Sequence, residues 1–335
     1  MSELEARILT ESEYNQWDQL VEQSKQGTIF HLSKWITTTA NSLHLDYAII
    51  GVFKDFQLIG GCSFFIKNKF HIFKIGYTSV PLTFFGGLVM SLPKSTKVRE
   101  SEQREHTIIS SILEKIQTSN FFYLSLINSP DLVDIRPFKK QGWREHVYYT
   151  YIVSLENDIF KNLSSKVRTN IRKAQKLGIT VKKEYNPDIY WELTKSTYGK
   201  QNMKVPYQKK HLFTLMEMIR ENNLGEMWIA RTPNGEPASA DFIIWDNKQA
   251  HRWIAASDEQ FKDTNATSLL IFEIFLDLQK KGFHDINMMS ANMSNLKAFT
   301  TAFNPRLVQY YRVERIYGTG KLFELAGIVK EMWTK

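Results

Sequence analysis

The hydrophobic and polar positions predict a series of elements that occurs twice along the chain. Apolar residues recurring every 3.6 positions indicate helices, whereas alternation or short apolar runs indicate strands. Each half predicts two helices, three strands, and then helix, strand, helix, strand. The ranges in the first half are 11–22, 32–42, 47–53, 57–67, 73–80, 106–118, 121–127, 135–141 and 147–155. Those in the second half are 188–198, 209–221, 226–231, 238–245, 251–256, 267–281, 284–288, 295–302 and 307–315.

A local match supports the duplication. Four positions share their spacing in the two halves: Asp131, Phe138, Gly142 and Trp143 in the first, and Asn292, Phe299, Phe303 and Asn304 in the second. Phe138 and Phe299 are therefore expected to occupy equivalent places. The repeat predicts two domains, at residues 1–157 and 158–335. The polar stretch 91–103 is expected to be a mobile loop within the first domain.

A basic helix is predicted at 165–178, directly after the join. Ser164 or Ser165 can cap its first turn, and Gly178 can end it in a left-handed conformation. Its basic stripe consists of Arg168, Arg172 and Lys176, with Lys166 and Lys173 beside it. The stripe is consistent with a phosphate-binding ridge, but a solvated helix face is the commoner explanation for a charge stripe alone.

Composition narrows the class of protein. Of the 335 residues 43% are hydrophobic, which predicts folded globular domains. The single cysteine, Cys62, lies in an apolar strand and cannot form an internal disulfide, so nothing here requires an oxidising compartment. The N-terminus lacks a signal-peptide pattern, and no apolar run reaches the roughly 20 residues of a membrane span, so a cytoplasmic location is expected.

The charge and the absent motifs limit the chemistry. The net charge of +8 favours anionic partners, such as phosphorylated cofactors, nucleic acid or a membrane face, and is also compatible with simple solubility. The sequence contains no His/Cys cluster with metal-ligand spacing, no phosphate-binding P-loop and no Gly-x-Ser-x-Gly motif. Metal-dependent and nucleoside-triphosphate mechanisms are therefore not expected.

The strongest candidate for chemistry is the stretch 257–266, which leads from a predicted strand to a helix starting near Thr267. Free amides and the positive end of the helix dipole meet there, which suits a pyrophosphate. The predicted cofactor-binding residues are Lys262, Asp263, Thr264, Asn265, Ala266 and Thr267.

Several segments resemble the FemAB-type tandem GNAT acyltransferases. They are GTIFHLSKW, PLTFFGG, SSKVRTNIRKAQKLGITV and NATSLLIFEIFLDLQKKGFHDINMMSANMSNLKAFTTAFNP, and the resemblance runs from about Trp17 to Arg315. It implies an α/β protein with two tandem GNAT-like domains, each a mixed, mostly antiparallel twisted sheet flanked by helices. It also implies that the second domain binds the acyl donor and that the first walls the acceptor cleft. The residues expected in that cleft are His31, Lys34, Trp35, Arg168, Arg172 and Tyr310.

The chain departs from the family pattern at two places. Where GNAT loops carry Gln or Arg and two small residues, this sequence has Phe261, Thr264 and Ala266, and only Ala266 fits. GNAT enzymes often carry Asn followed seven residues later by a proton-donating Tyr; Asn292 fits, but the Tyr position is Phe299. A Lys common in FemAB-type chains is replaced by Thr300, with Lys297 one turn earlier.

Attack on a thioester or ester needs a base and a donor to the developing oxyanion. Asp241, His251 and Asp258 are the candidate bases, Asn292 completes the predicted catalytic set, and a backbone amide near 256–258 is the expected oxyanion donor. Asp241 lies in an apolar strand and needs a partner or a function, and a structural hydrogen bond is the commoner explanation.

Three functions remain open at this point. The first is transfer of an acetyl-type group from acetyl-CoA or a related acyl-CoA to an amine or hydroxyl of a sugar or cell-envelope precursor. The second is an aminoacyltransferase of the peptidoglycan type that takes its donor from aminoacyl-tRNA. The third is a non-catalytic binding module on the same scaffold, which Phe299, Thr300 and the missing glycines favour.

Overall fold

The computed structural model describes residues 4–69, 73–92, 95–199, 203–289, 291–293 and 296–317. The chain forms two compact units. Unit 1 contains the chain up to Tyr148 and again from Tyr310, and unit 2 contains Tyr149–Gln309. The domains expected from the repeat, 1–157 and 158–335, follow the order of the sequence, whereas the units exchange their last strands.

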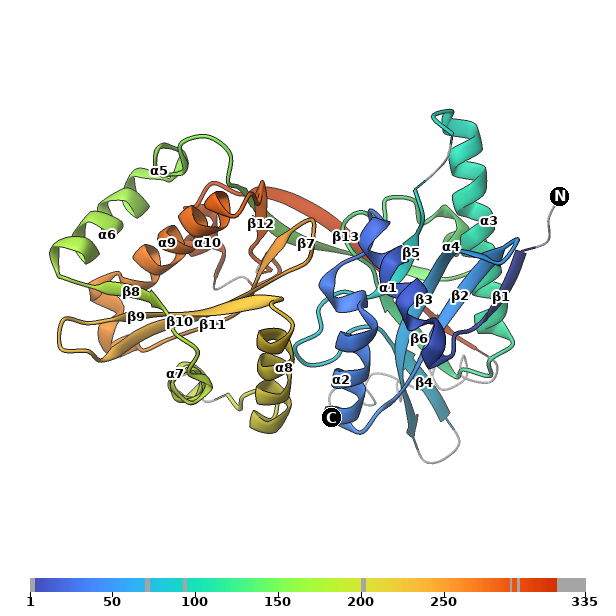
Figure 1. The fold of residues 1–335 in the computed structure, drawn as a ribbon, viewed down its shortest axis with the longest axis horizontal. Coiled ribbons are helices and arrows are strands. Elements are labelled where there is room, and N and C mark those ends of the chain that lie inside the picture. The colour runs from blue at the N-terminus through green and yellow to red at the C-terminus, as the bar shows by residue number, and fades with distance from the viewer. Residues whose placement is uncertain are drawn as a thin grey trace. The chain divides into compact units, whose positions relative to one another are not determined.

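Unit 1 is a mixed sheet with helices on it (Figure 1). Its sheet order is β1-β2-β3-β4-β6-β13, with β5 on β3, and among the described strands only β4 and β6 pair in parallel. The strands that begin and end within unit 1 are β1 (Leu4–Ile8), β2 (Asp46–Lys54), β3 (Gln57–Lys69), β4 (Phe73–Tyr77), β5 (Gly87–Met90) and β6 (Tyr123–Ile127). The helices are α1 (Tyr14–Gln23), α2 (Ser33–Leu43), α3 (Val98–Gln117) and α4 (Arg136–Lys140), with short 3-10 turns η1 (Glu11–Glu13) and η2 (Ile29–His31).

Two apolar clusters among the described residues connect the helices of unit 1 to its sheet. One core contains Trp17 of α1 and Ile36 of α2. The other contains Ile108 and Ile112 of α3, together with Phe138 of α4. Cys62 lies in this second core, fully buried, as a small apolar residue.

The prediction of a loop at 91–103 is wrong for its second part, because α3 begins at Val98. The first turns of α3 carry charged side chains, and its buried positions start only at Ile108. The sequence of these turns therefore shows no apolar repeat that would predict a helix. The guanidinium of Arg104 donates to the carbonyl oxygen of Ser91 at 2.8 Å, which ties the start of the helix to the end of β5. Strands β1 and β5 were also not predicted, because both are too short to show a period.

Unit 2 has the same kind of sheet, in the order β7-β12-β11-β10-β9-β8. Its strands are β7 (Arg144–Ser154), of which the part from Tyr149 belongs here, β8 (Thr180–Lys183), β9 (Gly225–Arg231), β10 (Pro237–Trp245), β11 (Ala250–Ser257) and β12 (Asp285–Asn287). Its helices are α5 (Ile159–Asn162), α6 (Ser165–Lys176), α7 (Pro187–Gly199), α8 (Lys209–Glu221), η3 (Glu259–Thr264), α9 (Ala266–Lys280) and α10 (Lys297–Thr301). The last strand, β13 (Arg306–Ile316), begins in unit 2 and continues into unit 1.

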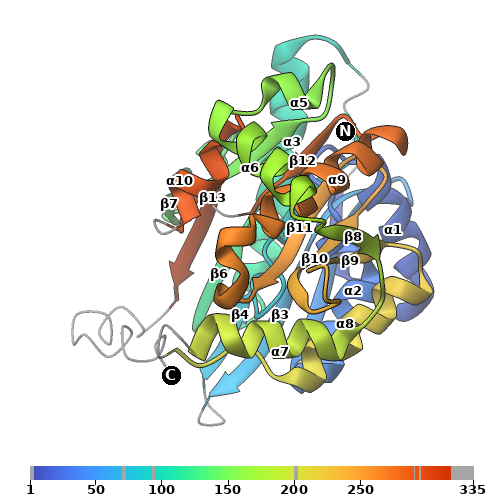
Figure 2. The ribbon, with the colours of Figure 1, turned by 90° about the vertical axis from the view of Figure 1, so that its left-hand side faces the viewer.

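Helices cover both faces of this sheet. Figures 1 and 2 show α6 and α9 on one side of β8–β11 and α7 on the other. Helix α9 is apolar nearly all round and packs with Val167, Ile171 and Ala174 of α6 in the core of unit 2. The cap of α6 is Ser164, whose Oγ accepts from the Val167 amide at 3.3 Å, and Gly178 is left-handed as predicted.

The duplication is visible in the topology of the two units. In each, two strands pair in parallel, β4 with β6 and β11 with β12, and a short helix follows, α4 or α10. Phe138 lies in α4 and Phe299 in α10, the equivalent elements. The last strand of each repeat then completes the sheet of the other unit: β7 pairs with β12 in unit 2, and β13 pairs with β6 in unit 1.

Candidate functional site

The parallel strands β11 and β12 of unit 2 separate after a short contact. Ala250 pairs with Ile286 and His251 with Asn287, and the pairing ends there although β11 continues to Ser257. The chain after β12 follows β7 instead, because the Met288 amide donates to the Tyr151 carbonyl at 2.7 Å. Met289 then turns the backbone with a φ of 57°. In the described part of the chain, no strand pairs with this edge of β11 beyond His251. The place where β11 and β12 are no longer paired is called the gap below.

The equivalent position in unit 1 is closed by the protein itself. There β4 pairs with β6 at Ile75, Gly76 and Tyr77, and Thr78 extends the contact. The Thr78 amide donates to the Ser125 carbonyl at 3.1 Å, and its Oγ1 accepts from the Ile127 amide at 2.7 Å.

The segment that follows β4 completes this closure. The Gly86 amide donates to the Ile127 carbonyl, and the backbone of Gly86 forms a bridge with Asn128. Gly87 has a φ of 83°, and a Cβ there would lie 2.3 Å from the Asn128 Oδ1, so the two glycines of PLTFFGG serve this closure. Of the two parallel pairs among the described strands, β4 and β6 are joined further by this segment, whereas β11 and β12 are not.

Helix α9 follows β11 along the chain, after the short turn η3. Asn265, the residue before the helix, is left-handed with a φ of 59°. It therefore supplies the conformation for which many such loops use glycine, since asparagine tolerates this region. Ala266 is buried at the first helical position.

The predicted cofactor-binding side chains around η3 have local partners. Lys262 forms an exposed ion pair with Glu259 at 2.8 Å, and the Thr264 hydroxyl donates to the Phe261 carbonyl. The Thr267 hydroxyl donates to the Ser239 Oγ of β10 at 3.1 Å. Asp263 is exposed, and its carbonyl accepts from the Asn265 side chain at 3.0 Å. In the first turn of α9 the Ala266 amide donates to the Thr264 Oγ1, and the amides of Ser268 and Leu269 donate to the Asn265 carbonyl.

Asp241 forms a bidentate ion pair with Arg252 of the neighbouring strand. The Arg252 Nε and Nη2 donate to the two carboxylate oxygens at 2.5 and 3.0 Å. The Asp241 side chain is fully buried and that of Arg252 is 10% exposed. This is the partner that an aspartate in an apolar strand requires, and it favours a structural role for Asp241 over that of a base.

His251 lies at the narrow end of the gap, on the last residue of β11 that pairs with β12. Its Nε2 is 3.6 Å from the Oδ2 of Asp246, in the turn between β10 and β11. Burial alone would raise the pKa of Asp246, but the neighbouring His251 and, after it, Lys248 together outweigh burial and hold that pKa below its usual value. Of the three predicted bases, His251 is the one next to the gap with a carboxylate to orient it.

The other two predicted catalytic residues make local contacts. The Asp258 carboxylate caps η3 by accepting from the Gln260 amide at 2.9 Å. The Asn292 Oδ1 accepts from the Tyr149 amide at 3.0 Å. Phe299 packs edge-on against Phe303, and Thr300 is buried. The catalytic roles of Asp258 and Asn292 remain predictions.

The cleft residues predicted in unit 1 belong mostly to an aromatic cluster. His31 is fully buried and accepts from Thr28 in the capping of η2, and Trp35 donates to the Thr83 Oγ1 at 2.9 Å. Ring contacts connect Trp35 through Phe30 and Phe85 to Tyr310, which stacks on Tyr148 at 5.7 Å between centroids. Lys34 is exposed. Contact of these residues with an acceptor remains a prediction.

The basic stripe of α6 is partly engaged within unit 2. Arg168 donates to the carbonyls of Lys161 and Leu163 at the end of α5, at 3.1 and 2.6 Å. The Arg172 guanidinium lies 5.2 Å from the centre of the Phe160 ring. Lys166, Lys173 and Lys176 are exposed on the same helix. The arginines therefore help to hold α5 against α6, and the lysines form its solvent-facing charge.

Sequence reasoning missed Arg252, Asp246 and Asn287. Arg252 could have been found, because 238–245 and 251–256 were predicted as consecutive strands and an aspartate in one favours an arginine in the other. Asp246 and Asn287 gave no such signal, since a turn aspartate and a strand asparagine are common.

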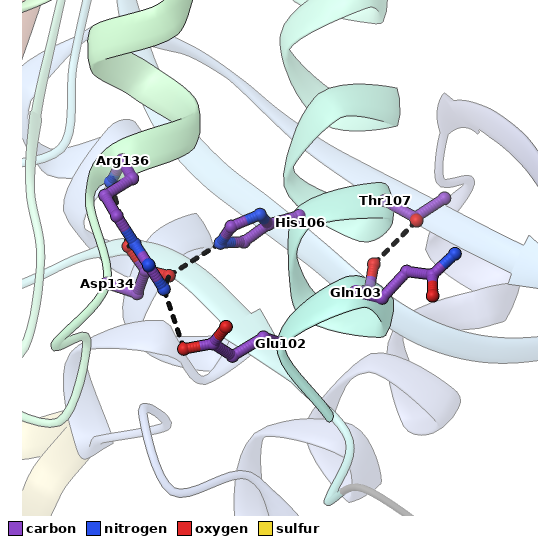
Figure 3. A network of polar contacts seen from close by, with 6 residues as sticks. All are labelled: Glu102, Gln103, His106, Thr107, Asp134 and Arg136. Atoms are coloured by element: carbon purple, nitrogen blue, oxygen red, sulfur yellow. Dashed lines mark hydrogen bonds and ion pairs between the residues drawn. The ribbon is translucent and has the colours of Figure 1, made fainter. Parts of the chain in front are cut away.

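A polar network around α3 is a second candidate, in unit 1. The His106 Nε2 lies 2.6 Å from the Oδ2 of Asp134, and Arg136 binds both Asp134 and Glu102 (Figure 3). The helix side of this network lines an open depression of about 460 Å³. The four side chains form one connected series of hydrogen bonds and ion pairs that ties α3 to Asp134 and Arg136, which favours a structural role.

This network predicts a pH-dependent stability. The hydrogen bond from Arg136 holds the pKa of Asp134 well below its usual value, with burial opposing and His106 adding to the effect. A depressed folded-state pKa stabilises the fold above the unfolded value near 3.9, and the contribution is lost as pH falls through the folded value. Asp134→Asn is expected to lower the free energy of unfolding by about 1 kcal/mol at pH 7, with a deficit that shrinks below about pH 4.

Denaturant unfolding at pH 7 and pH 3 measures this difference, with the exposed Asp55→Asn outside the network as control. An equal loss of unfolding free energy in Asp134→Asn at pH 7 and at pH 3 would contradict the stabilising role of the Asp134 carboxylate.

The described residues contain neither a membrane-spanning helix nor a metal-binding cluster. None of the helices there is long and apolar enough to cross a membrane. Nor does that part of the chain contain a group of three or more His, Cys, Asp or Glu side chains that could hold a metal ion.

Comparison with known proteins identifies the fold. Residues 161–297 match the family described as acetyltransferase (GNAT) domain. A search of curated protein sequences gives no significant match. The crystal structure of FemX superposes with a TM-score of 0.75 at 12% identity, covering 96% of this chain and 99% of that one.

Two further solved structures agree over nearly the whole chain. A tandem GNAT protein from the clavulanic acid biosynthesis pathway, solved without acetyl-CoA, gives a TM-score of 0.58 at 10% identity and covers 94% of this chain and 99% of that one. The structure of L-PGS from Bacillus licheniformis gives a TM-score of 0.58 at 11% sequence identity, and the match covers 96% of this chain and 97% of that one. The predicted tandem GNAT fold is thereby confirmed; identities this low establish the fold alone.

Proposed function

We propose that this chain, whose residues 161–297 match the acetyltransferase (GNAT) domain family, transfers an acetyl-type group from a CoA thioester to an amine or hydroxyl of a sugar or cell-envelope precursor. The observation that carries the proposal is the gap between β11 and β12. Backbone groups of β11 beyond His251 border this gap, and an extended pantetheine arm offers amides that can pair with such an edge.

The position of α9 supports the same donor. The chain passes from the open edge of β11 through η3 to the first turn of α9, where amides and the helix dipole favour an anion. Asn265 provides the left-handed turn that brings the backbone into this position. The missing glycines therefore argue less strongly against acyl-CoA than the sequence indicated.

The contrast between the units supports a division of roles. In unit 1 the equivalent strands are joined by Thr78 and Gly86, so a donor has no comparable opening there. We assign donor binding to unit 2 and the acceptor wall to unit 1, as the repeat suggested. His31, Lys34, Trp35 and Tyr310 remain the acceptor candidates of unit 1.

The chemistry is a direct transfer. The acceptor's lone pair attacks the thioester carbonyl carbon, the C–S bond breaks, and the amine or hydroxyl loses a proton. His251 is the proposed base, oriented by Asp246. With Phe299 in place of a tyrosine, the thiolate takes its proton from solvent or from the protonated base.

Calorimetry on the full chain tests the donor. Acetyl-CoA and CoA are expected to bind with similar affinity, because the nucleotide and pantetheine supply most of the contact. Absence of heat with either ligand at millimolar concentration would rule out this form of the proposal.

A second function is favoured by one observation, the exposed lysines of α6. An aminoacyl-tRNA donor would place phosphates along Lys166, Lys173 and Lys176. Its affinity should then fall steeply with salt, and replacing the three lysines by alanine should reduce the slope of log K against log salt by roughly 2 to 3. Filter binding across a salt series measures this slope. A slope that is unchanged in the triple variant would exclude α6 as the tRNA site. The third alternative, a non-catalytic module, predicts CoA binding without turnover.

A further inference from the structure

Asn287, the last residue of β12, has one half of its side chain fully engaged. Its Oδ1 accepts from the Thr150 hydroxyl at 2.5 Å and from the Met289 amide at 3.0 Å. Because a backbone amide can only donate, the second bond fixes which end of the side chain is the oxygen. The orientation of the amide group is therefore determined by its surroundings.

The other half of the same side chain has no partner. Asn287 is fully buried, and among the described residues its Nδ2 finds no hydrogen-bond acceptor. An unsatisfied buried donor costs free energy, and native proteins contain few of them. The two accepted bonds use only Oδ1, and neither involves the NH2 group of the side-chain amide. The bonds to Thr150 and Met289 therefore do not explain why this residue carries a donor.

The position of Asn287 indicates what the donor could serve. It pairs with His251 in the last parallel pair before β11 and β12 separate, so it lies at the narrow end of the gap. Its neighbours Ile286 and Met288 both pack in the core with α9. Since successive strand side chains alternate, Asn287 points to the opposite face of the sheet, as does its strand partner His251.

We propose that the Asn287 Nδ2 donates a hydrogen bond to the carbonyl oxygen of the acyl donor; this assignment rests on the proposed function. An acyl group that enters the gap from the open end reaches its apex with the carbonyl beside Asn287 and with the acceptor on the His251 face. The orphaned donor gains its missing acceptor when the acyl group binds.

The same bond strengthens as the reaction proceeds. When the acceptor's nitrogen or oxygen bonds to the carbonyl carbon, the π electrons move onto the carbonyl oxygen, and Nδ2 then faces an oxyanion. Collapse of this intermediate restores the C=O bond and expels the CoA thiolate, while the proton of the acceptor passes to the base. Asn287 is thus a side-chain oxyanion donor, which substitution can test where a backbone amide cannot be tested.

Two variants of the full chain separate this role from a structural one. Asn287→Leu removes the donor at similar volume, and Asn287→Asp keeps the two accepted bonds and exchanges the donor for an acceptor. Thr150→Val is the matched control, because it removes one bond to Oδ1 and leaves Nδ2 in place. Should the leucine variant fail to fold, the aspartate variant decides.

Calorimetry with acetyl-CoA and with CoA isolates the acyl group, since the two ligands share everything else. Both Asn287 variants are expected to weaken acetyl-CoA binding by up to about tenfold relative to CoA, the size of one hydrogen bond. The rate at which the two Asn287 variants release thiol from acetyl-CoA should be about 10²-fold or more below that of the wild type. Thr150→Val should leave the ratio of the two affinities unchanged.

Three results would overturn the assignment. Equal loss of CoA and acetyl-CoA affinity in the Asn287 variants would mean a structural role. Unchanged acetyl-CoA affinity and thiol release would mean that Nδ2 does not meet the acyl group. If the wild-type chain binds neither ligand, the CoA-dependent function fails as well, and this outcome is distinguishable from the other two by the wild-type measurement alone.

Discussion

Replacing Ala255 with tryptophan is expected to weaken acetyl-CoA binding by at least ~100-fold, equivalent to about 2.7 kcal/mol. Ala255 is an exposed residue of β11 beyond the last pair with β12, so its side chain borders the gap. An indole ring there would occupy the space that the pantetheine arm needs. Calorimetry with acetyl-CoA measures the loss, and the far-ultraviolet spectrum checks that the fold is kept.

The matched control is Thr180→Trp, which introduces the same ring at an exposed position of β8. In the sheet of unit 2, β8 lies at the edge remote from β12. This variant should bind acetyl-CoA as the wild type does. Equal affinity of the Ala255 variant and the wild type would show that the donor does not use this gap.

Asp241→Leu is expected to lower the free energy of unfolding by roughly 3 to 5 kcal/mol, because it leaves the Arg252 guanidinium nearly buried without its carboxylate. Denaturant titration measures the change. If Asp241 were instead a catalytic base, the variant would lose turnover while its stability remained close to that of the wild type.

A double variant distinguishes the ion pair from a packing effect. Asp241→Leu combined with Arg252→Met removes both charges and keeps an apolar filling of similar volume. Since a buried ion pair often contributes little more than an apolar pair, most of the lost stability should return. A double variant no more stable than Asp241→Leu alone would contradict this explanation.

The order of elements could be predicted because apolar periods are strong in long, half-buried elements. Helices α8 and α9 and strands β9 and β10 were predicted within one or two residues, as were the cap and the end of α6. The start of α3 was missed because its first turns face solvent and carry no apolar period. The exchange of last strands is also invisible to a local pattern, because β7 and β13 have the same period whichever strand they pair with.

The sequence pointed to one part of the candidate site, whose role remains a prediction, and not to the other. The loop before α9 was identified from residue types that end strands and begin helices. The gap was not, because it depends on where the pairing of β11 with β12 stops, and that is set by the Met288 amide bonding to β7. Asn287 became a candidate only through the burial of its Nδ2, a property that no sequence pattern carries.

The repeat needs one adjustment from the structure. The left-handed residue that follows the short helix is Gly142 in the first copy and Asn304 in the second. Counted from Phe138 and Phe299, these positions lie one residue apart, whereas the spacing in the sequence pairs Gly142 with Phe303. The copies therefore match as elements, while the register shifts by one residue within this turn.

The central claim is that unit 2 holds the acyl donor between β11 and β12, with its phosphates at the start of α9. Amide hydrogen exchange of the full chain, with and without saturating CoA, tests this most directly because it locates protection along the sequence. The expected result is slower exchange at residues 252–257 and 264–269 and no change at 75–88, the closed equivalent in unit 1. Protection confined to 75–88, or none in unit 2, would contradict the claim.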